Sequence, residues 1–230
     1  MLNEWWHEEQ LPNELLQSRV ASLYKKGDPQ DPANYRPISL LNAFLKILAA
    51  IVKKRIEAGV EHALGDTQFG FRKATSPTQA VFIARRLQDY AERIGLNGAL
   101  LFLDWEKAFD KVDQQLLITA LRTFGIPDKL LNLVKAMYNN PTFKVTIDKV
   151  DSPWMPQQTG IRQGCPLSPY TFILVMDLIF RIVNKDIRAQ MGERFETFRG
   201  HDITFTEILF ADDTLLFAAD GESITTYYMR

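Results

Sequence analysis

Three aspartates offer the clearest chemistry in this sequence. Asp104 directly follows the apolar run 99–103, and the pair Asp212 and Asp213 separates two apolar runs late in the chain. Each feature alone has an ordinary explanation, because Asp suits caps and turns. If the strands are neighbours in one sheet, however, three carboxylates meet at one spot. Like charges that close repel unless they share a proton or a cation, so the pattern predicts a cation site.

The chemistry of such a site would be that of Mg²⁺. This ion prefers oxygen ligands in octahedral geometry and often takes substrate phosphates to complete its shell. Two such ions can activate an attacking hydroxyl and stabilise a leaving pyrophosphate in an in-line displacement. The histidines offer no alternative ligand set, since His7, His62 and His201 have no ligand-like spacing. We therefore expect two Mg²⁺ ions, which Mn²⁺ could replace.

A small β-sheet must position these carboxylates. The apolar runs 207–210 and 215–218 predict a β-hairpin with an acidic tip, and the continuous run 99–103 predicts a buried strand. Apolar spacing and turn residues predict helices at 42–64, 78–93, 114–124, 128–137 and 169–184, and short strands at 20–24 and 144–147. A few strands with helices between them predict an α+β fold in which helices back one antiparallel sheet.

Composition excludes several classes of protein. A chain of 230 residues that is 46% hydrophobic is long enough to bury a core, and a single cysteine, Cys165, excludes a disulfide framework. Residues 1–19 lack the basic start and apolar stretch of a signal peptide. The longest apolar run, 172–183, is interrupted by Asp177 and Arg181 and is too short to span a bilayer. We expect an intracellular protein without a membrane partner.

Charge is distributed unevenly although the net charge is only −1. Residues 19–86 carry twelve Lys or Arg against five Asp or Glu, whereas residues 101–230 carry fourteen against seventeen. The asymmetry would suit a first half that binds phosphates and a second half that binds cations. Two ordinary solvated surfaces explain it equally well.

Five segments of the chain, taken in order, resemble the reverse transcriptase family, and most closely the polymerase of retrotransposons that lack long terminal repeats. They are Leu23-Tyr-Lys-Lys-Gly-Asp28 through Asn34-Tyr-Arg-Pro-Ile-Ser39, Gln68-Phe-Gly-Phe-Arg72, Phe102-Leu-Asp-Trp-Glu-Lys-Ala-Phe-Asp110, Gly160-Ile-Arg-Gln-Gly-Cys-Pro-Leu-Ser-Pro169 and Phe210-Ala-Asp-Asp213. The resemblance implies a right-hand polymerase fold with fingers and palm and without a thumb. Residues 1–98 would be mostly fingers and 99–230 mostly palm, with a fingers-like return near 140–165.

The resemblance implies catalytic roles for the acids. Asp104 and Asp212 would ligate the metal ions, and Asp213 would complete the acidic pocket. Phe109 would lie under the incoming sugar, where its ring would clash with a 2′-hydroxyl and select deoxynucleotides. The alternative is that Phe109 is a core aromatic at the start of the next helix.

Further residues would contact nucleotide and template. Gln163 and Gly164 would pack against the nucleotide and the template base, although Gly164 could be a loop hinge only. Arg72, helped by Lys73, would meet the triphosphate, a task suited to a permanently charged, fork-shaped donor. The template backbone would lie near exposed basic residues of the fingers, namely Lys25, Lys26 and Arg36.

The implied activity is that of an RNA-directed DNA polymerase. It would bind an RNA template, a DNA primer and deoxynucleoside triphosphates, and would work in the nucleus. Two departures leave an alternative open. Residues Ala74-Thr75-Ser76 replace the family's usual Gly-Arg-Ser, and the sequence ends seventeen residues after Asp213. The alternative is a catalytically inactive fingers-palm fragment of a decayed retroelement that only binds nucleic acid.

Two relatives of the polymerase are less favoured by the residues. A viral RNA-dependent RNA polymerase would place Gly at position 211 and an acid at position 109, where this chain has Ala211 and Phe109. An intron-encoded maturase would share the fold, but nothing in the sequence resembles its splicing extension. The sequence does not indicate an oligomeric state.

Overall fold

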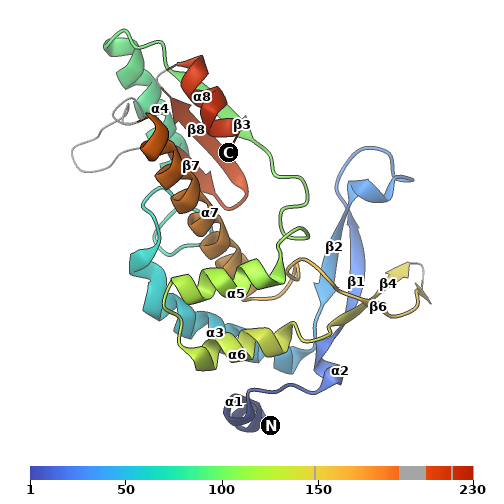
Figure 1. Ribbon diagram of the computed structural model, residues 1–230. Coiled ribbons are helices and arrows are strands. Elements are labelled where there is room, and N and C mark those ends of the chain that lie inside the picture. The colour runs from blue at the N-terminus through green and yellow to red at the C-terminus, as the bar shows by residue number, and fades with distance from the viewer. Residues whose placement is uncertain (148, 192–205, 219, 230) are drawn as a thin grey trace. The chain divides into compact units, whose positions relative to one another are not determined.

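The computed structural model describes residues 1–147, 149–191, 206–218 and 220–229 (Figure 1). Its contacts divide the chain into two compact units. Unit 1 comprises residues 1–62 and 107–172, and unit 2 comprises residues 63–106 and 173–230. These boundaries are not those of the predicted division at residues 98 and 99, so the assignment of fingers and palm remains a prediction.

The sheet of unit 1 is built on a long β-hairpin. β1 (Gln17–Tyr24) pairs antiparallel with β2 (Tyr35–Leu40), and β4 (Thr142–Ile147) pairs parallel with β1 on its other side. Two short strands, β5 (Val150–Asp151) and β6 (Met155–Pro156), pair antiparallel with β4. The strands predicted at 20–24 and 144–147 are therefore present and slightly longer, but their parallel pairing was not expected.

Three helices form the main core of unit 1. α3 (Ala43–Val60) and α5 (Gln114–Thr123) are each capped by a side chain, because Asn42 accepts the N–H of Phe44 and Asp113 accepts the N–H of Leu116. α6 (Asp128–Met137) packs against both helices. Their inner faces are apolar and at most 1% exposed at Leu48, Val52, Leu117, Leu121, Leu131 and Leu133. Each such buried side chain contributes about 1.5–3 kcal/mol to folding.

Shorter elements complete unit 1. The N-terminal segment forms the helices α1 (Leu2–Glu8) and α2 (Asn13–Leu16). Single 3₁₀ turns, η1 (Pro32–Asn34) and η2 (Glu61–Ala63), precede β2 and follow α3. The predicted helix 42–64 therefore consists of α3 and this last turn.

Unit 2 contains a three-stranded antiparallel sheet in the order β3, β8, β7. Its strands are β3 (Ala99–Leu103), β7 (Glu207–Phe210) and β8 (Asp213–Ala218). α4 (Pro77–Arg93) covers part of one face, where Ile208, Leu215 and Phe217 form a core with residues of this helix. A complete capping box between Ser76 and Gln79 begins α4.

Two further helices, α7 and α8, precede and follow the β7–β8 hairpin in the sequence. α7 (Ser168–Met191) begins one residue before the predicted start and continues past the predicted end at 184; its first five residues belong to unit 1. α8 (Gly221–Tyr228) contacts β3 and β8. No helix among the described residues is both long enough and apolar enough to cross a membrane.

β3 is not the buried strand that its apolar run predicted. Phe102 is 74% exposed and Leu100 is 45% exposed. Both pair with residues of the face that α4 covers, because Leu100 lies opposite Phe217 and Phe102 opposite Leu215. The prediction was wrong because an apolar run does not reveal how far a helix extends over a sheet, and α4 covers β7 and β8 but leaves this face of β3 open.

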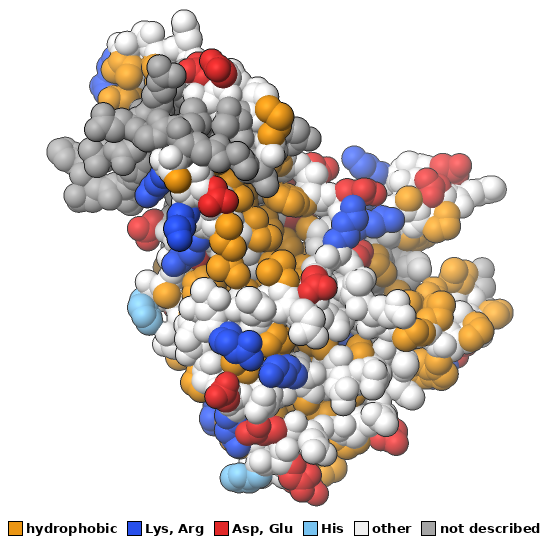
Figure 2. Space-filling model, in the orientation of Figure 1, with side chains coloured by type: hydrophobic (Ala, Val, Ile, Leu, Met, Phe, Trp, Pro, Cys, Tyr) orange, Lys and Arg blue, Asp and Glu red, His pale blue; other side chains and the backbone are white. Residues whose placement is uncertain are grey.

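The predicted α+β class is confirmed, with helices packed on a small antiparallel sheet. The charge asymmetry along the sequence does not produce one continuous basic surface on the face shown in Figure 2. There, Lys and Arg side chains lie among Asp and Glu side chains. The expectation of a basic first half therefore remains without support from this face.

Candidate active site

The tip of the β7–β8 hairpin presents two of the three predicted acids. Phe210 pairs with Asp213, which leaves Ala211 and Asp212 as a two-residue loop. Ala211 has a φ of 58°, whereas Asp212 does not have a positive φ. A loop with a positive φ at its first residue alone fits a type II′ turn, which matches the twist of a hairpin. Asp212 therefore lies at the turn, and Asp213 begins the returning strand.

The third acid lies at the end of the neighbouring strand. β3 pairs with β8 up to Leu103, which lies opposite Thr214. Asp104 directly follows Leu103 and Asp213 directly precedes Thr214, so the two acids lie at the same end of the sheet. The predicted neighbourhood of the two strands is thus confirmed, and the sheet brings all three acids to one of its ends.

A chain of hydrogen bonds connects the two acidic segments. The indole Nε1 of Trp105 donates to Oγ1 of Thr214 over 3.0 Å, and Thr214 Oγ1 donates to the carbonyl oxygen of Asp212 over 3.3 Å. Thr214 is buried, so its hydroxyl needs such partners. The connection restrains the end of β3 against the turn that carries Asp212.

The carboxylates fit a divalent cation in chemistry but are not assembled around one. Asp104 and Asp213 are exposed and Asp212 is half-buried, so a ligand can reach them. All three offer oxygen donors, which suit Mg²⁺ or Mn²⁺. Within the described residues, no group of three or more His, Cys, Asp or Glu side chains is arranged to hold a metal ion. The two-ion site therefore remains a prediction. His7 and His62 are exposed, and His201 lies outside the described residues.

Phe109, in unit 1, is half-buried and stacks on the first turns of α7. Its ring lies 4.5 Å from that of Phe172, with an interplanar angle of 12°. The carbonyl oxygen of Phe109 accepts the N–H of Ile161 over 2.9 Å. Phe172 thus supports the ring of Phe109, and the bond to Ile161 holds the backbone of Phe109. This arrangement is compatible with both predicted roles, a gate under the sugar and a core aromatic.

Gln163 and Gly164 lie in the loop before α7, close to β2. Gln163 Nε2 donates to Asp110 over 3.0 Å, and the carbonyl oxygen of Gln163 accepts the N–H of Ser39 over 2.7 Å. Gly164 has a φ of +113°, and a Cβ there would lie 2.6 Å from the carbonyl oxygen of Ser39. Asp110, Gln163 and Ser39 border a pocket of about 400 Å³ in unit 1. Only glycine fits position 164, so the loop can approach β2 closely.

Arg162 anchors the same loop from inside. It is 3% exposed, its Nη2 donates to the carbonyl oxygen of Leu16 over 2.7 Å, and its Nε donates to Gln157 over 3.2 Å. Burial lowers the pKa of Arg162 and raises the pKa of Tyr138, whose ring lies 6.0 Å from the guanidinium. Tyr138 therefore stays neutral at physiological pH.

Arg72 and Lys73 belong to unit 2, as the acids do. Nη1 of Arg72 donates to the carbonyl oxygens of Gly65 over 2.7 Å and of Gln68 over 3.1 Å, and the residue is half-buried. Lys73 is exposed. Arg72 therefore closes the turn that precedes it, and its predicted contact with a triphosphate remains a prediction.

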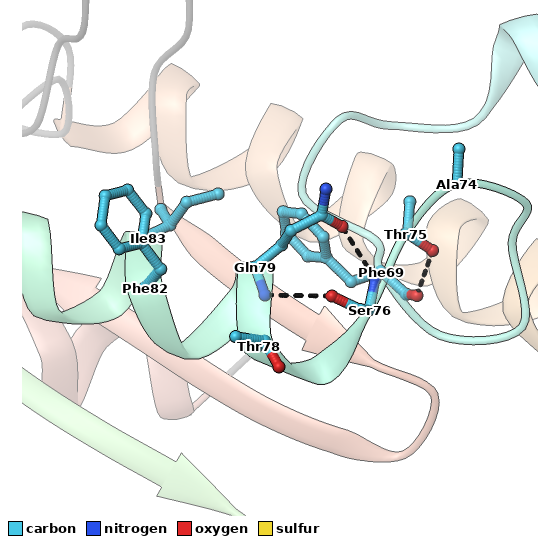
Figure 3. Close-up of a pocket in the computed structure, with 8 residues that line it drawn as sticks. All are labelled: Phe69, Ala74, Thr75, Ser76, Thr78, Gln79, Phe82 and Ile83. Carbon is cyan, nitrogen blue, oxygen red and sulfur yellow. Dashed lines mark hydrogen bonds between the residues drawn. The ribbon is translucent and has the colours of Figure 1, made fainter.

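Two of the three residues after Lys73 have structural tasks. Thr75 Oγ1 donates to the carbonyl oxygen of Phe69 over 2.7 Å, and Ser76 caps α4 (Figure 3). They border a pocket of about 550 Å³, and its lining consists of Phe69, Ala74, Thr75, Ser76, Thr78, Gln79, Phe82 and Ile83. This lining holds no charged side chain, so the pocket offers no counterion for a triphosphate.

The residues predicted to contact the template lie at and near the turn of the β1–β2 hairpin. Lys25, Lys26 and Arg36 are all exposed. The N–H of Lys25 donates to Asn34 over 2.8 Å, and Arg36 pairs with Leu23 in the sheet. The hairpin thus presents these basic groups to solvent, which is compatible with phosphate binding and with ordinary solvation.

Sequence reasoning gave no role to four residues beside the predicted ones: Gln68, Trp105, Phe172 and Thr214. Gln68 and Trp105 occur within the motifs of the resemblance, so their positions were the available signal. Phe172 and Thr214 carry no such signal, because a buried aromatic in a helix and a threonine in a strand are common.

Comparison with known proteins identifies the family. The family described as reverse transcriptase (RNA-dependent DNA polymerase) matches residues 24–228. The chain is 30% identical over 220 residues to the transposon TX1 uncharacterized 149 kDa protein of Xenopus laevis, which covers 96% of this chain and 16% of that protein. It is also 30% identical over 223 residues to the retrovirus-related Pol polyprotein from type-1 retrotransposable element R2 of Nasonia vitripennis, covering 96% of this chain and 20% of the relative.

Solved structures agree on the fold. A telomerase from Candida tropicalis in complex with a fragment of telomeric RNA superposes with a TM-score of 0.67 at 9% identity, over 99% of this chain and 41% of the telomerase. At this identity the likeness concerns the fold alone. The family match and the relatives confirm the resemblance seen in the motifs: the chain belongs to the reverse transcriptase family, in the branch of retrotransposons without long terminal repeats.

Proposed function

We propose that this chain carries the catalytic centre of a retrotransposon's RNA-directed DNA polymerase. The observation that carries the proposal is the sheet of unit 2, in which β3 and the β7–β8 hairpin bring Asp104, Asp212 and Asp213 to one end. The reaction would add deoxynucleotides to the 3′-hydroxyl of a DNA primer on an RNA template. An enzyme that primes at chromosomal DNA would act in the nucleus.

Asp104 and Asp212 would hold the metal ions, and Asp213 would complete the acidic pocket. Bound Mg²⁺ would lower the pKa of the primer hydroxyl and neutralise charge on the leaving pyrophosphate. The chain's own contribution is to hold the acids on rigid strands. The bonds from Trp105 through Thr214 to the Asp212 carbonyl support this arrangement.

Further residues are assigned to the nucleotide and the template by the family resemblance. Phe109 would exclude a ribose by contact with its 2′-hydroxyl, and Gln163 with Gly164 would pack against the nucleotide and template base. Arg72 and Lys73 would neutralise the triphosphate. The template backbone would contact basic side chains of the first hairpin, Lys25, Lys26 and Arg36.

A second candidate is a chain that binds nucleic acid without turnover. Two observations favour it: no metal-binding group is assembled within the described residues, and Arg72 donates to two backbone carbonyls. This chain spans 16% of the length of one relative and 20% of the other.

Primer extension separates the two candidates. Purified chain, an RNA template with a DNA primer, Mg²⁺ and deoxynucleotides should give extension that Asp212→Ala abolishes. Asp66→Ala, at an exposed aspartate of the same unit, is the matched control and should retain extension. Binding of the primer-template by the wild-type chain without any extension would instead support the second candidate.

A further inference from the structure

Residues 67–69 lie alongside β7 without forming a regular strand. The N–H of Phe69 donates to the carbonyl oxygen of Leu209 over 2.7 Å, and the N–H of Leu209 donates to that of Thr67 over 2.8 Å. Gln68 and Leu209 form a parallel bridge. This segment therefore lies at the edge of the sheet, directly beside the strand that leads to the acidic turn.

The side chain of Gln68 reaches that turn. Its Oε1 accepts the N–H of Gly70 over 2.7 Å and the N–H of Ala211 over 3.3 Å. Both partners are donors, so the oxygen of the amide must face them. Gln68 is 1% exposed, and its Nε2 has no hydrogen-bond partner within the described part of the chain. Oε1 is therefore the atom through which Gln68 acts on its surroundings.

Gly70 allows this close approach. A Cβ at position 70 would lie 2.2 Å from the backbone nitrogen of Ala211 and 2.9 Å from its Cα. No side chain fits there without displacing the turn. Ala211 itself has a φ of 58°, a conformation that non-glycine residues adopt only where their surroundings hold them in it.

We propose that Gln68 is a positioning residue for the acidic turn. Its Oε1 fixes the N–H of Ala211, and with it the left-handed backbone that sets the direction of the next residue, Asp212. Gly70 provides the space for this contact. The inference rests on the proposed function, because it matters for catalysis only if Asp212 holds a metal ion.

The test compares variants that keep or remove the acceptor. Gln68→Met has similar length and no oxygen, whereas Gln68→Glu keeps an oxygen at the same place but exchanges the unpartnered nitrogen for a second oxygen and adds a buried charge when it ionises. Gln88→Met makes the same change at an exposed position of α4. Ile208→Val, at a buried position of β7, reports what a general loss of stability in that strand does.

The first readout is Mn²⁺ binding, which is measured by the loss of the electron paramagnetic resonance signal of the free ion. The part of this binding that Asp212→Ala removes is the binding at the acidic site. The second readout is the Mg²⁺ concentration for half-maximal primer extension. Gln68→Met should weaken Mn²⁺ binding and raise the required Mg²⁺ concentration, each by about 10-fold or more, as for other residues that orient metal ligands. Gln68→Glu should change both less than Gln68→Met does, and Gln88→Met and Ile208→Val should leave them unchanged.

The outcomes separate this inference from the function beneath it. Mn²⁺ binding that depends on Asp212 but is equal in the wild-type chain and Gln68→Met would overturn the inference and leave the function intact. A loss that Ile208→Val shares would also overturn it, because a general loss of stability in β7 would then be the cause. If the wild-type chain neither extends a primer nor binds Mn²⁺ through Asp212, the proposed function fails first and the inference fails with it.

Discussion

Trp105 donates its indole N–H to the hydroxyl of Thr214, 3.0 Å away on the neighbouring strand. Trp105 directly follows Asp104, and Thr214 directly follows Asp213 and donates to the carbonyl oxygen of Asp212. The pair therefore restrains the two acidic segments against each other. A hydrogen bond at this place contributes to both stability and the geometry of the acids.

Trp105→Phe should show this double effect. The variant keeps an aromatic ring but loses the donor, so the free energy of unfolding should fall by about 1 kcal/mol. Misplaced acids should also lower kcat for extension by roughly 10-fold or more, since small displacements in a catalytic site are costly. Urea unfolding and primer extension measure the two quantities. Trp154→Phe, at a partly exposed tryptophan of unit 1, is the control. Equal kcat in both variants would limit the Trp105 bond to a structural role.

Elements with strong local signals could be predicted from the sequence. The predicted α6 (128–137) and β3 (99–103) have the observed bounds, and the hairpin of β7 and β8 was expected, because apolar period and turn residues are encoded locally. Contacts between distant segments could not be predicted. The parallel pairing of β1 with β4 and the bond from Ala211 to Gln68 join residues more than a hundred positions apart, and nothing in the local pattern specifies them.

The same limit applies to the site. The resemblance supplied Asp104, Asp212 and Asp213, and the sheet confirms that their strands are neighbours. It could not supply the contacts that hold them, since Gln68 accepts the N–H of the distant Ala211 and Thr214 accepts the indole N–H of Trp105. Such partners depend on the assembled fold and not on residue type.

Phe172 should influence the choice of sugar if Phe109 is the gate. The two rings stack at 4.5 Å, and Phe172 is 2% exposed, so its removal would let Phe109 move away from the sugar. Phe172→Leu should lower the ratio of kcat/KM for deoxynucleotides over that for ribonucleotides. Phe109→Val, which removes the ring of the gate itself, should lower this ratio too. Primer extension with each nucleotide class measures this ratio.

Phe180→Leu is the matched control for that experiment, because Phe180 is a buried phenylalanine of the same helix at 5% exposure. It should reduce stability without changing the ratio. If Phe109→Val changes the ratio and Phe172→Leu does not, Phe172 has no part in selection. If neither changes it, Phe109 is a core aromatic and not the gate.

Gly164→Ala should destabilise unit 1. The new Cβ would lie 2.6 Å from the carbonyl oxygen of Ser39, and a φ of +113° is unfavourable for any side chain. We expect a loss of about 1–3 kcal/mol, together with weaker nucleotide binding if this loop contacts the nucleotide. Gly59→Ala is the opposite case, because nothing lies within 4 Å of a Cβ in α3 at that position. That change should stabilise the chain by about 0.5–1 kcal/mol. Thermal unfolding of both variants checks the signs, and a neutral Gly164→Ala would show that the loop can move away from β2.

Arg72→Gln should have two separable effects, one on stability and one on nucleotide binding. Nη1 of Arg72 donates to the carbonyl oxygens of Gly65 and Gln68, so the variant should lose about 1–3 kcal/mol of stability through unsatisfied carbonyls. If the guanidinium also meets the triphosphate, KM for deoxynucleotides should rise while binding of the primer-template stays the same, because only the nucleotide loses a charged partner. Lys73→Gln, at the exposed neighbour, should raise KM less and leave stability unchanged. If the variant loses stability but keeps its KM, Arg72 does not take part in nucleotide binding. Its role is then to close the turn before Gln68, the side chain on which the acidic turn depends.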